Sequence, residues 1–322
     1  MHKISGRWKL GLALAVVTAA SWGILAIALS VVLRAVDPIT LTWFRFLTAA
    51  LILGVVLAVM GKLPRSFAAI GSKGWLVLAL ALGGIVGNFV LFVTALGYVS
   101  PTVNQVVTQL SPILLMLGGV AAFHERFSVI RWAGFALLLV GLPLFFNRRL
   151  PELLQWHSGL GFGVLLLVIA SLSWAIYGLA QKWMLRRMPA QHILLMVYIG
   201  AAIVLFPASH PAALLKVDTV QAWLLAFCCA NTVVAYGAFA EALKHWEASR
   251  VGATLTLTPL FTMIAMWLLQ HLVPGFVKPE QLNVVSVLGA LIVIGGSMLC
   301  ALGSAPVAAQ VAARDEVGAG VS

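Results

Sequence analysis

Hydrophobic residues occur in long runs along this chain, separated by short stretches of polar or helix-breaking residues. Most runs have about 18 to 25 residues, the length that an α-helix needs to cross about 30 Å of hydrocarbon. Segments of about ten residues that alternate between polar and apolar are missing, which excludes an outer-membrane barrel. The pattern predicts ten membrane-spanning helices, at about residues 10–33, 40–60, 75–97, 101–121, 128–146, 159–183, 191–208, 219–242, 249–271 and 284–302.

The first five predicted spans resemble the last five. Three motifs recur at corresponding places: Ser21-Trp22 and Ser173-Trp174, Ser111-Pro112 and Thr258-Pro259, and Gly134…Gly141 and Gly289…Gly296. Because each half has an odd number of spans, the second half must enter the membrane from the opposite side. We therefore predict an all-α membrane protein with an inverted repeat of five plus five helices.

The repeat divides the chain into five parts. They are a cytoplasmic N-terminus at 1–9, a first repeat at 10–146, a periplasmic linker at 147–158, a second repeat at 159–302 and a disordered cytoplasmic tail at 303–322.

Composition supports the membrane assignment, with 62% hydrophobic and 9% charged residues and a mean hydropathy of +1.06. A soluble domain has roughly a quarter charged residues. The net charge of +11 does not indicate a nucleic-acid partner, because lysine and arginine lie in short clusters between the apolar runs. With a cytoplasmic N-terminus, most of the 20 basic residues fall on the cytoplasmic side. This bias places both termini in the cytoplasm.

The sequence offers little for a membrane enzyme. Cys228, Cys229 and Cys300 lie in apolar runs without metal-ligand spacing, and we expect no metal, no cofactor and no catalytic residue. All nine carboxylates map to loops or helix ends. Proton-coupled carriers usually have an ionisable residue deep in the membrane, so the sequence favours a facilitator or an exchanger over a proton-driven pump.

Amides, hydroxyls and a proline interrupt the apolar run of the fourth predicted span. Gln105, Gln109 and Pro112 share one helix face, and the proline frees a carbonyl four residues earlier. Pro259 has the same effect in the ninth span, where Thr258 belongs to a stripe of threonines. Such groups face protein or water rather than lipid. They either line a substrate cavity or join neighbouring helices by hydrogen bonds.

Other polar side chains lie near the middle of their spans. Trp22 and Trp174 occupy matching positions at mid-depth, although tryptophan normally gathers at the membrane interface. Tyr177 follows Trp174 on the same helix face, and Asn88 and Asn231 lie at mid-depth in the third and eighth spans. A polar cavity would give these groups partners. The alternative is that the tryptophans fill space between the halves and that the asparagines join helices.

Arg45 is the one charged residue that lies well inside a predicted span rather than at its end, about two turns from the outer end. Two interpretations remain open for its side chain. It either extends outward to the membrane interface or holds the carboxylate of a substrate.

These features together resemble the drug/metabolite transporter superfamily, and within it the EamA-type exporters with ten helices. The resemblance covers about residues 8–303 and includes Glu125, which precedes the helix that contains Gly134 and Gly141. Glu280 has the matching position before Gly289, so we expect the two glutamates to begin the fifth and tenth spans. The resemblance implies an inner-membrane, multi-pass carrier that exports amino acids or related metabolites. It also implies a central cavity lined by helices one, three, four, six, eight and nine.

Our hypothesis from the sequence is a secondary transporter of small metabolites, such as amino acids or related amphipathic molecules, that works by alternating access as a monomer surrounded by lipid. The residues expected to bind substrate are Trp22, Asn88, Gln105, Gln109, Trp174, Tyr177, Asn231 and Thr258. Pro112 and Pro259 would break their helices and act in gating, and Arg45 would pair with a substrate carboxylate.

Other functions remain as alternatives. Transport of a nucleotide sugar, a lipid precursor or a drug is one, but phosphates would need a basic cluster at the cavity, where only Arg45 is available. A membrane enzyme and a non-transporting membrane protein are more remote alternatives.

Overall fold

The computed structural model describes residues 7–64, 71–123, 128–153, 155, 158–280 and 282–302, and these residues form helices and connections without a strand. Eight helical segments of the described chain are long and apolar enough to cross a membrane. They are α1 (Trp8–Val32), α2 (Pro38–Val59), α3 (Gly71–Ala95), α8 (Gly159–Met184), α9 (Ala190–Leu205) with η2 (Phe206–Ala208), α10 (Thr219–His245), α11 (Ala248–Leu255) with α12 (Thr258–Leu272), and α13 (Val284–Leu302).

Shorter helices complete the fold. These are α4 (Pro101–Val107), α5 (Leu110–Phe123) and α6 (Val129–Phe145), together with α7 (Leu150–Leu153) and η3 (Pro211–Lys216) in the connections. The predicted all-α class is confirmed, and every predicted span coincides with a helix or with a pair of helices. The expected N-terminal residues 1–6, the tail at 303–322 and Glu125 lie outside the described residues.

Capping residues that can be read from the sequence begin several helices. The side chain of Asp37 accepts hydrogen bonds from the backbone N–H groups of Ile39 and Thr40 at the start of α2. Serine caps have the same role in α4, α6 and α8, and Asp218 forms a capping box with Gln221 in α10. These bonds satisfy backbone donors that a helix terminus leaves unpaired.

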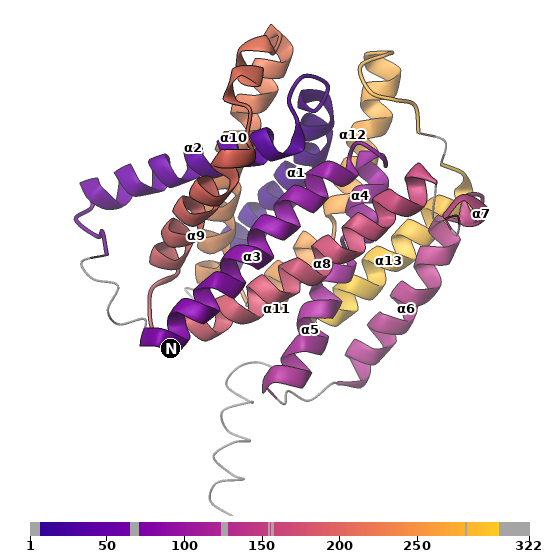
Figure 1. The fold of residues 1–322 in the computed structure, drawn as a ribbon. Coiled ribbons are helices and arrows are strands. Elements are labelled where there is room, and N and C mark those ends of the chain that lie inside the picture. The colour runs from indigo at the N-terminus through magenta and orange to yellow at the C-terminus, as the bar shows by residue number, and fades with distance from the viewer. Residues whose placement is uncertain are drawn as a thin grey trace, which may run out of the picture.

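Contacts between helices repeat with a two-fold pattern. α1 packs against α10 and α12, and correspondingly α8 packs against α3 and α5. α2 packs against α9, and α6 packs against α13 (Figure 1). When the helices of the first half are matched in order with those of the second, each of these contacts maps onto another or onto itself.

Glycines bring the backbones of α6 and α13 close together. A Cβ atom added to Gly134 would lie 2.5 Å from the carbonyl oxygen of Gly296, and one added to Gly141 would lie 2.9 Å from that of Gly289. The first glycine of each helix therefore faces the second glycine of the other, as in an antiparallel pair. The repeated glycine motif of the sequence is thus the contact surface of these two helices.

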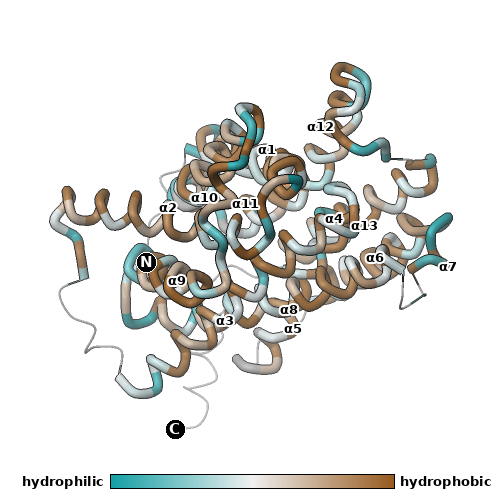
Figure 2. The backbone as a smooth tube through the Cα atoms, turned by 45° about the horizontal axis from the view of Figure 1, so that its top comes forward, coloured by the Kyte–Doolittle hydropathy of each residue, from teal (hydrophilic) through white to brown (hydrophobic). Residues whose placement is uncertain are grey.

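Connections gather on two opposite faces. On one face, the Arg34 guanidinium donates to the Phe276 carbonyl at 2.6 Å, and the His210 backbone N–H donates to the Thr40 hydroxyl at 2.7 Å. On the other face, the His192 ring lies 2.8 Å from the Lys62 carbonyl. Figure 2 shows hydrophobic residues along the helices and hydrophilic residues near helix ends and connections. Exposed apolar side chains on the helices are what a lipid-facing surface requires.

Candidate functional site

Two helical segments break at corresponding places in the two halves. The first break separates α4 from α5, and the second separates α11 from α12. Each break lies shortly before a proline, Pro112 in the first half and Pro259 in the second. Proline cannot donate the hydrogen bond that would continue the helix, so the interruption precedes it by about one turn.

The carbonyls that the prolines free have partners close by in the chain. The Thr108 carbonyl accepts the backbone N–H of Ser111 at 2.9 Å. The Leu255 carbonyl accepts the hydroxyl of Thr258 at 2.7 Å. The Thr258 hydroxyl thus stabilises the second break by a hydrogen bond within the same part of the chain. A role of Thr258 in substrate binding stays a prediction.

Gln109 lies within the first break and connects it to the second. Its side-chain Nε2 donates to the Thr256 carbonyl in the second break at 2.9 Å, and its Oε1 accepts the Ser297 hydroxyl of α13 at 2.8 Å. Only 7% of Gln109 is exposed. One buried amide therefore joins both breaks and the last helix.

The other three amides predicted from the sequence also donate to carbonyls on other helices. The bonds run from Gln105 to Trp22, from Asn231 to Ser21 and from Asn88 to Ala170, at 3.0, 3.0 and 2.9 Å. This is the arrangement expected of residues that join helices. Their amide nitrogens are engaged in the structure, and substrate binding by these residues stays a prediction.

Two buried asparagine side chains keep an unpaired oxygen although their amide nitrogens donate hydrogen bonds. Within the described part of the chain, the buried Oδ1 atoms of Asn231 and Asn104 have no hydrogen-bond partner. A buried acceptor without a donor costs about 1–3 kcal/mol, so such atoms are uncommon in native proteins. A bound molecule with N–H or O–H donors would supply what they lack.

The two central tryptophans have aromatic or apolar surroundings. The ring of Trp22 lies 5.3 Å from that of Tyr236 and 6.1 Å from that of Phe239, measured between centroids. Trp174 packs against an apolar cluster that includes Phe46. Trp22 and Trp174 are both partly buried, so each retains accessible surface.

Arg45 of α2 points into the protein and is only 3% exposed. It therefore does not extend to the membrane interface, which removes one of the two interpretations drawn from the sequence. Its Nε lies 3.3 Å from the Thr232 hydroxyl of α10, and its Cζ lies 5.0 Å from the centre of the Phe89 ring of α3.

Three of the four tyrosines of the chain gather near this arginine. The rings of Phe89 and Tyr198 of α9 lie 4.7 and 5.9 Å from the ring of Phe46, the neighbour of Arg45 in α2, and Tyr177 of α8 belongs to the same packed cluster. Tyr236 follows Thr232 by four positions in α10 and so shares its helix face. We call Arg45, Phe89, Tyr177, Tyr198, Thr232 and Tyr236 the arginine–tyrosine cluster. It draws on helices from both halves of the chain.

The sequence interpretation included Arg45 and Tyr177 but missed Phe89, Tyr198, Thr232 and Tyr236. Two signals could have identified the last three. Tyrosine is rare in this chain, with four residues, so each one inside a span is informative. Thr232 and Tyr236 are four positions apart and therefore share one face of the eighth predicted span.

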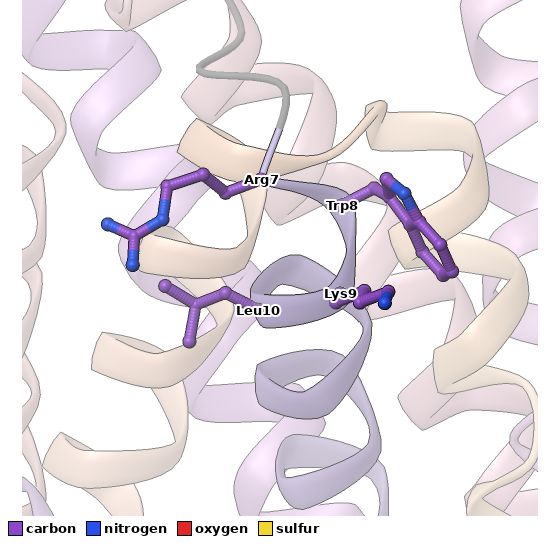
Figure 3. A pocket seen from close by; sticks show the side chains of 4 residues that line it. All are labelled: Arg7, Trp8, Lys9 and Leu10. Atoms are coloured by element: carbon purple, nitrogen blue, oxygen red, sulfur yellow. The ribbon is translucent and has the colours of Figure 1, made fainter.

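A separate hollow of about 310 Å³ lies at the N-terminal end of α1 (Figure 3). Its lining residues are Arg7, Trp8, Lys9 and Leu10, all of them exposed. Figure 3 shows Arg7 and Leu10 on one side of the helix and Trp8 and Lys9 on the other. Tryptophan and basic residues at a helix end are typical of the membrane interface, so we assign this hollow to the lipid boundary.

Glu280 departs from its expected position. It does not begin the last span, because α13 starts at Val284. Instead, its carboxylate accepts a hydrogen bond from the hydroxyl of Ser100, the cap of α4, and so bridges connections of the two halves. Beside it, Asn147 and Asn283 exchange side-chain hydrogen bonds at 3.2 and 2.9 Å.

Burial raises the pKa of Glu280 above its ordinary value of 4.5, and the Ser100 bond offsets this only in part. The folded state therefore favours the protonated acid. Its contribution to stability should be full below the ordinary value and should be lost as pH rises through the raised value. We expect the melting temperature of the purified protein, relative to that of Glu280→Gln, to rise as pH falls from 8 to 4.5.

Known families and relatives match nearly the whole chain. The model of the EamA-like transporter family matches residues 9–147 and again residues 161–302. The "Uncharacterized inner membrane transporter YhbE" of Escherichia coli is 41% identical over 297 residues, with 91% of this chain and 92% of the relative covered. An "Uncharacterized transporter" of Haemophilus influenzae is 36% identical over 294 residues, covering 91% of this chain and 95% of the relative.

More distant matches extend the comparison. A "Probable amino-acid metabolite efflux pump" of Salmonella typhimurium is 24% identical over 298 residues, with 88% of this chain and 92% of the relative covered. One crystal structure with 19% sequence identity has a TM-score of 0.60 and covers 90% of this chain and 94% of its own. At this identity the likeness shows the fold alone.

Proposed function

The chain belongs to the EamA-like transporter family, and from this premise we propose that it exports small metabolites across the inner membrane by alternating access. It is a transporter and not an enzyme, because the family match covers both halves. Inner-membrane location is part of the description of its Escherichia coli relative. A multi-pass protein with eight long apolar helical segments among its described residues fits that location.

The proposed topology has ten crossings, two inverted repeats and both termini in the cytoplasm. The two-fold pattern of helix contacts supports the repeat, and the crossed glycines of α6 and α13 support its inverted direction. The connections support ten crossings. Connections that follow odd-numbered crossings contact one another on one face, as expected of a chain that crosses the membrane back and forth. The excess of lysine and arginine on the other face supports its assignment to the cytoplasm.

The observation that carries the mechanism is the hydrogen bond from Gln109 to the Thr256 carbonyl, because it joins the two breaks directly. In inverted-repeat transporters, discontinuous helices form the substrate site, and rocking of the halves exposes that site to each side in turn. Broken helices at membrane depth are tolerated where they contact protein or line a cavity. The two breaks therefore mark the place where the halves move and where substrate would bind.

We further propose that the substrates are amino acids or related amphipathic molecules, carried by a monomer. The unpaired acceptors of Asn104 and Asn231, enclosed in this conformation, would suit an ammonium or amide donor in a conformation that exposes them, and Trp22 with Tyr236 offers an aromatic surface for an apolar side chain. The name of the distant Salmonella relative points to the same class. Nucleotide sugars and lipid-linked precursors are less suited, since the described spans hold two buried cations, Arg45 and Arg131, and Arg131 lies in the first turn of α6 rather than deep in the helix.

Reconstitution into proteoliposomes tests this proposal. We expect efflux of at least one radiolabelled amino acid well above that of protein-free liposomes. Trp174→Ala should raise KM for that substrate by about threefold to tenfold, since an aromatic contact contributes about 0.5–1.5 kcal/mol. Trp223→Ala, at a residue 75% exposed, should leave KM unchanged. Absence of flux for every compound tested, from protein with a normal melting transition, would refute the carrier function.

A further inference from the structure

We propose that Arg45 is the binding site for an anionic group, a carboxylate, of the transported molecule. The inference rests on the proposed transport function and names the class of substrate, which is an organic acid or a zwitterion. Arg45 and the tyrosines around it would make the carrier select acids over the corresponding amides and amines.

The first argument is the burial of an incompletely satisfied charge. Arg45 is 3% exposed, yet its one hydrogen bond to a described residue is that of Nε with the Thr232 hydroxyl. A guanidinium has five N–H donors, and a buried charge is costly unless it is paired and hydrogen-bonded. The Phe89 ring, 5.0 Å from Cζ, gives a favourable contact with a cation but carries no oxygen that could pair with the remaining donors.

The second argument is that the described carboxylates are engaged elsewhere. Each one caps a helix or pairs with another residue near a connection or helix end. Asp37 and Asp218 cap α2 and α10, Glu152 pairs with Arg149, Glu241 with Lys244 and Glu247 with Arg250, and Glu280 bonds Ser100. No ion pair within the described ranges includes Arg45. The described part of the chain thus leaves the counter-ion to be supplied from outside.

The third argument is access. The Nη1 and Nη2 atoms of Arg45 have no hydrogen-bond partner among the described residues, but they do not belong to the fully enclosed unpaired atoms either. Tyr236, on the same face of α10 as Thr232, is partly exposed. The terminal nitrogens of the guanidinium are therefore unpaired without being sealed off, and they lie on the Arg45 side chain that reaches from α2 to Thr232 of α10.

The composition of the cluster indicates which anion fits. A guanidinium binds a carboxylate through two parallel N–H···O bonds, and the cluster also contains the phenols of Tyr198 and Tyr236, which are hydrogen-bond donors. A single arginine neutralises one negative charge. A monocarboxylate fits this site, whereas a diphosphate would retain surplus charge in a low-dielectric environment.

The test compares compounds that differ only at the acid group. Binding of leucine, phenylalanine and methionine to the purified protein is measured by calorimetry, alongside their carboxamides and their decarboxylated amines. We expect at least one acid to bind about tenfold to a hundredfold more tightly than its amide, as hydrogen bonds to a charged group imply. Arg45→Gln should reduce this ratio to near one. Arg148→Gln, at an exposed arginine, should leave it unchanged.

Two further variants separate recognition from a structural role. Arg45→Lys keeps the charge but loses the bidentate geometry, so the ratio of acid to amide affinity should fall by about tenfold. Tyr236→Phe should lower it a few-fold. If Arg45→Gln fails to fold, the ratios of acid to amide affinity measured for Arg45→Lys and Tyr236→Phe still test the proposal. General destabilisation would weaken acid and amide binding alike and would leave the ratio unchanged.

The outcomes distinguish the two proposals. An unchanged ratio in the folded Arg45 variants, equal binding of acid and amide by the wild type, or no binding of any acid would each overturn the anion site. Acid-selective binding that depends on Arg45, without flux of the same compound in proteoliposomes, would support the anion site and count against the carrier function.

Discussion

Replacing Gly296 with alanine is expected to destabilise the protein by about 1–3 kcal/mol, the range for an overpacked contact. A Cβ atom at this position would lie 2.6 Å from the Gly134 carbonyl oxygen and 2.9 Å from the Leu138 backbone nitrogen of α6. Both neighbours are backbone atoms of a packed helix, so no rotamer change relieves the clash. The helices must move apart and lose van der Waals contact along their length.

Gly295 provides the matched control. It is adjacent to Gly296 in the same helix, but a Cβ atom added there would meet nothing within 4 Å. Gly295→Ala should therefore be neutral or stabilising, by up to about 1 kcal/mol, because alanine favours the helix more than glycine does. The melting temperatures of both variants in detergent, compared with the wild type, measure the difference. Equal melting temperatures for the two variants would contradict the close approach of α6 and α13.

The match between the glycine motifs illustrates what the sequence could predict. The repeat of Gly134 and Gly141 as Gly289 and Gly296 was visible from the spacing, and the approximate helix bounds followed from hydropathy. Such signals are local or repeated, so one sequence contains them. The crossed pairing of the glycines required the structure, because spacing within two helices does not specify which residues face each other across the contact.

Less of the candidate site could be predicted, because a sequence does not specify which residues of different helices face each other. A lone arginine in an apolar run is conspicuous, but its neighbours Tyr198, Thr232 and Phe89 come from three other helices. The four amides were identified as polar groups at mid-depth, yet their partners are backbone carbonyls, which carry no sequence signature. Contacts with backbone and between distant segments are therefore what the sequence analysis could not supply.

Gln109→Leu is expected to slow transport by about tenfold to a hundredfold at saturating substrate. Leucine has a similar size but cannot donate to the Thr256 carbonyl or accept from the Ser297 hydroxyl. Each buried group left without a partner costs about 1–3 kcal/mol, and each 1.4 kcal/mol corresponds to a factor of ten in an equilibrium. Because Gln109 joins the two breaks, the loss should change the balance between the conformations that the halves adopt. Initial rates of counterflow in proteoliposomes measure this effect.

A double-mutant cycle with Ser297→Ala shows whether the bond between the breaks matters beyond simple packing. Ser297→Ala removes one bond to Gln109 but leaves the bond that joins the breaks, so transport should slow only a few-fold. In the Ser297→Ala background, Gln109→Leu should cost less than in the wild type, because one of its bonds is already lost. Wild-type rates for Gln109→Leu would mean that the amide only fixes the closed packing of the helices. The site would then have to be sought in the arginine–tyrosine cluster alone, where Arg45 contacts residues from several helices without depending on Gln109.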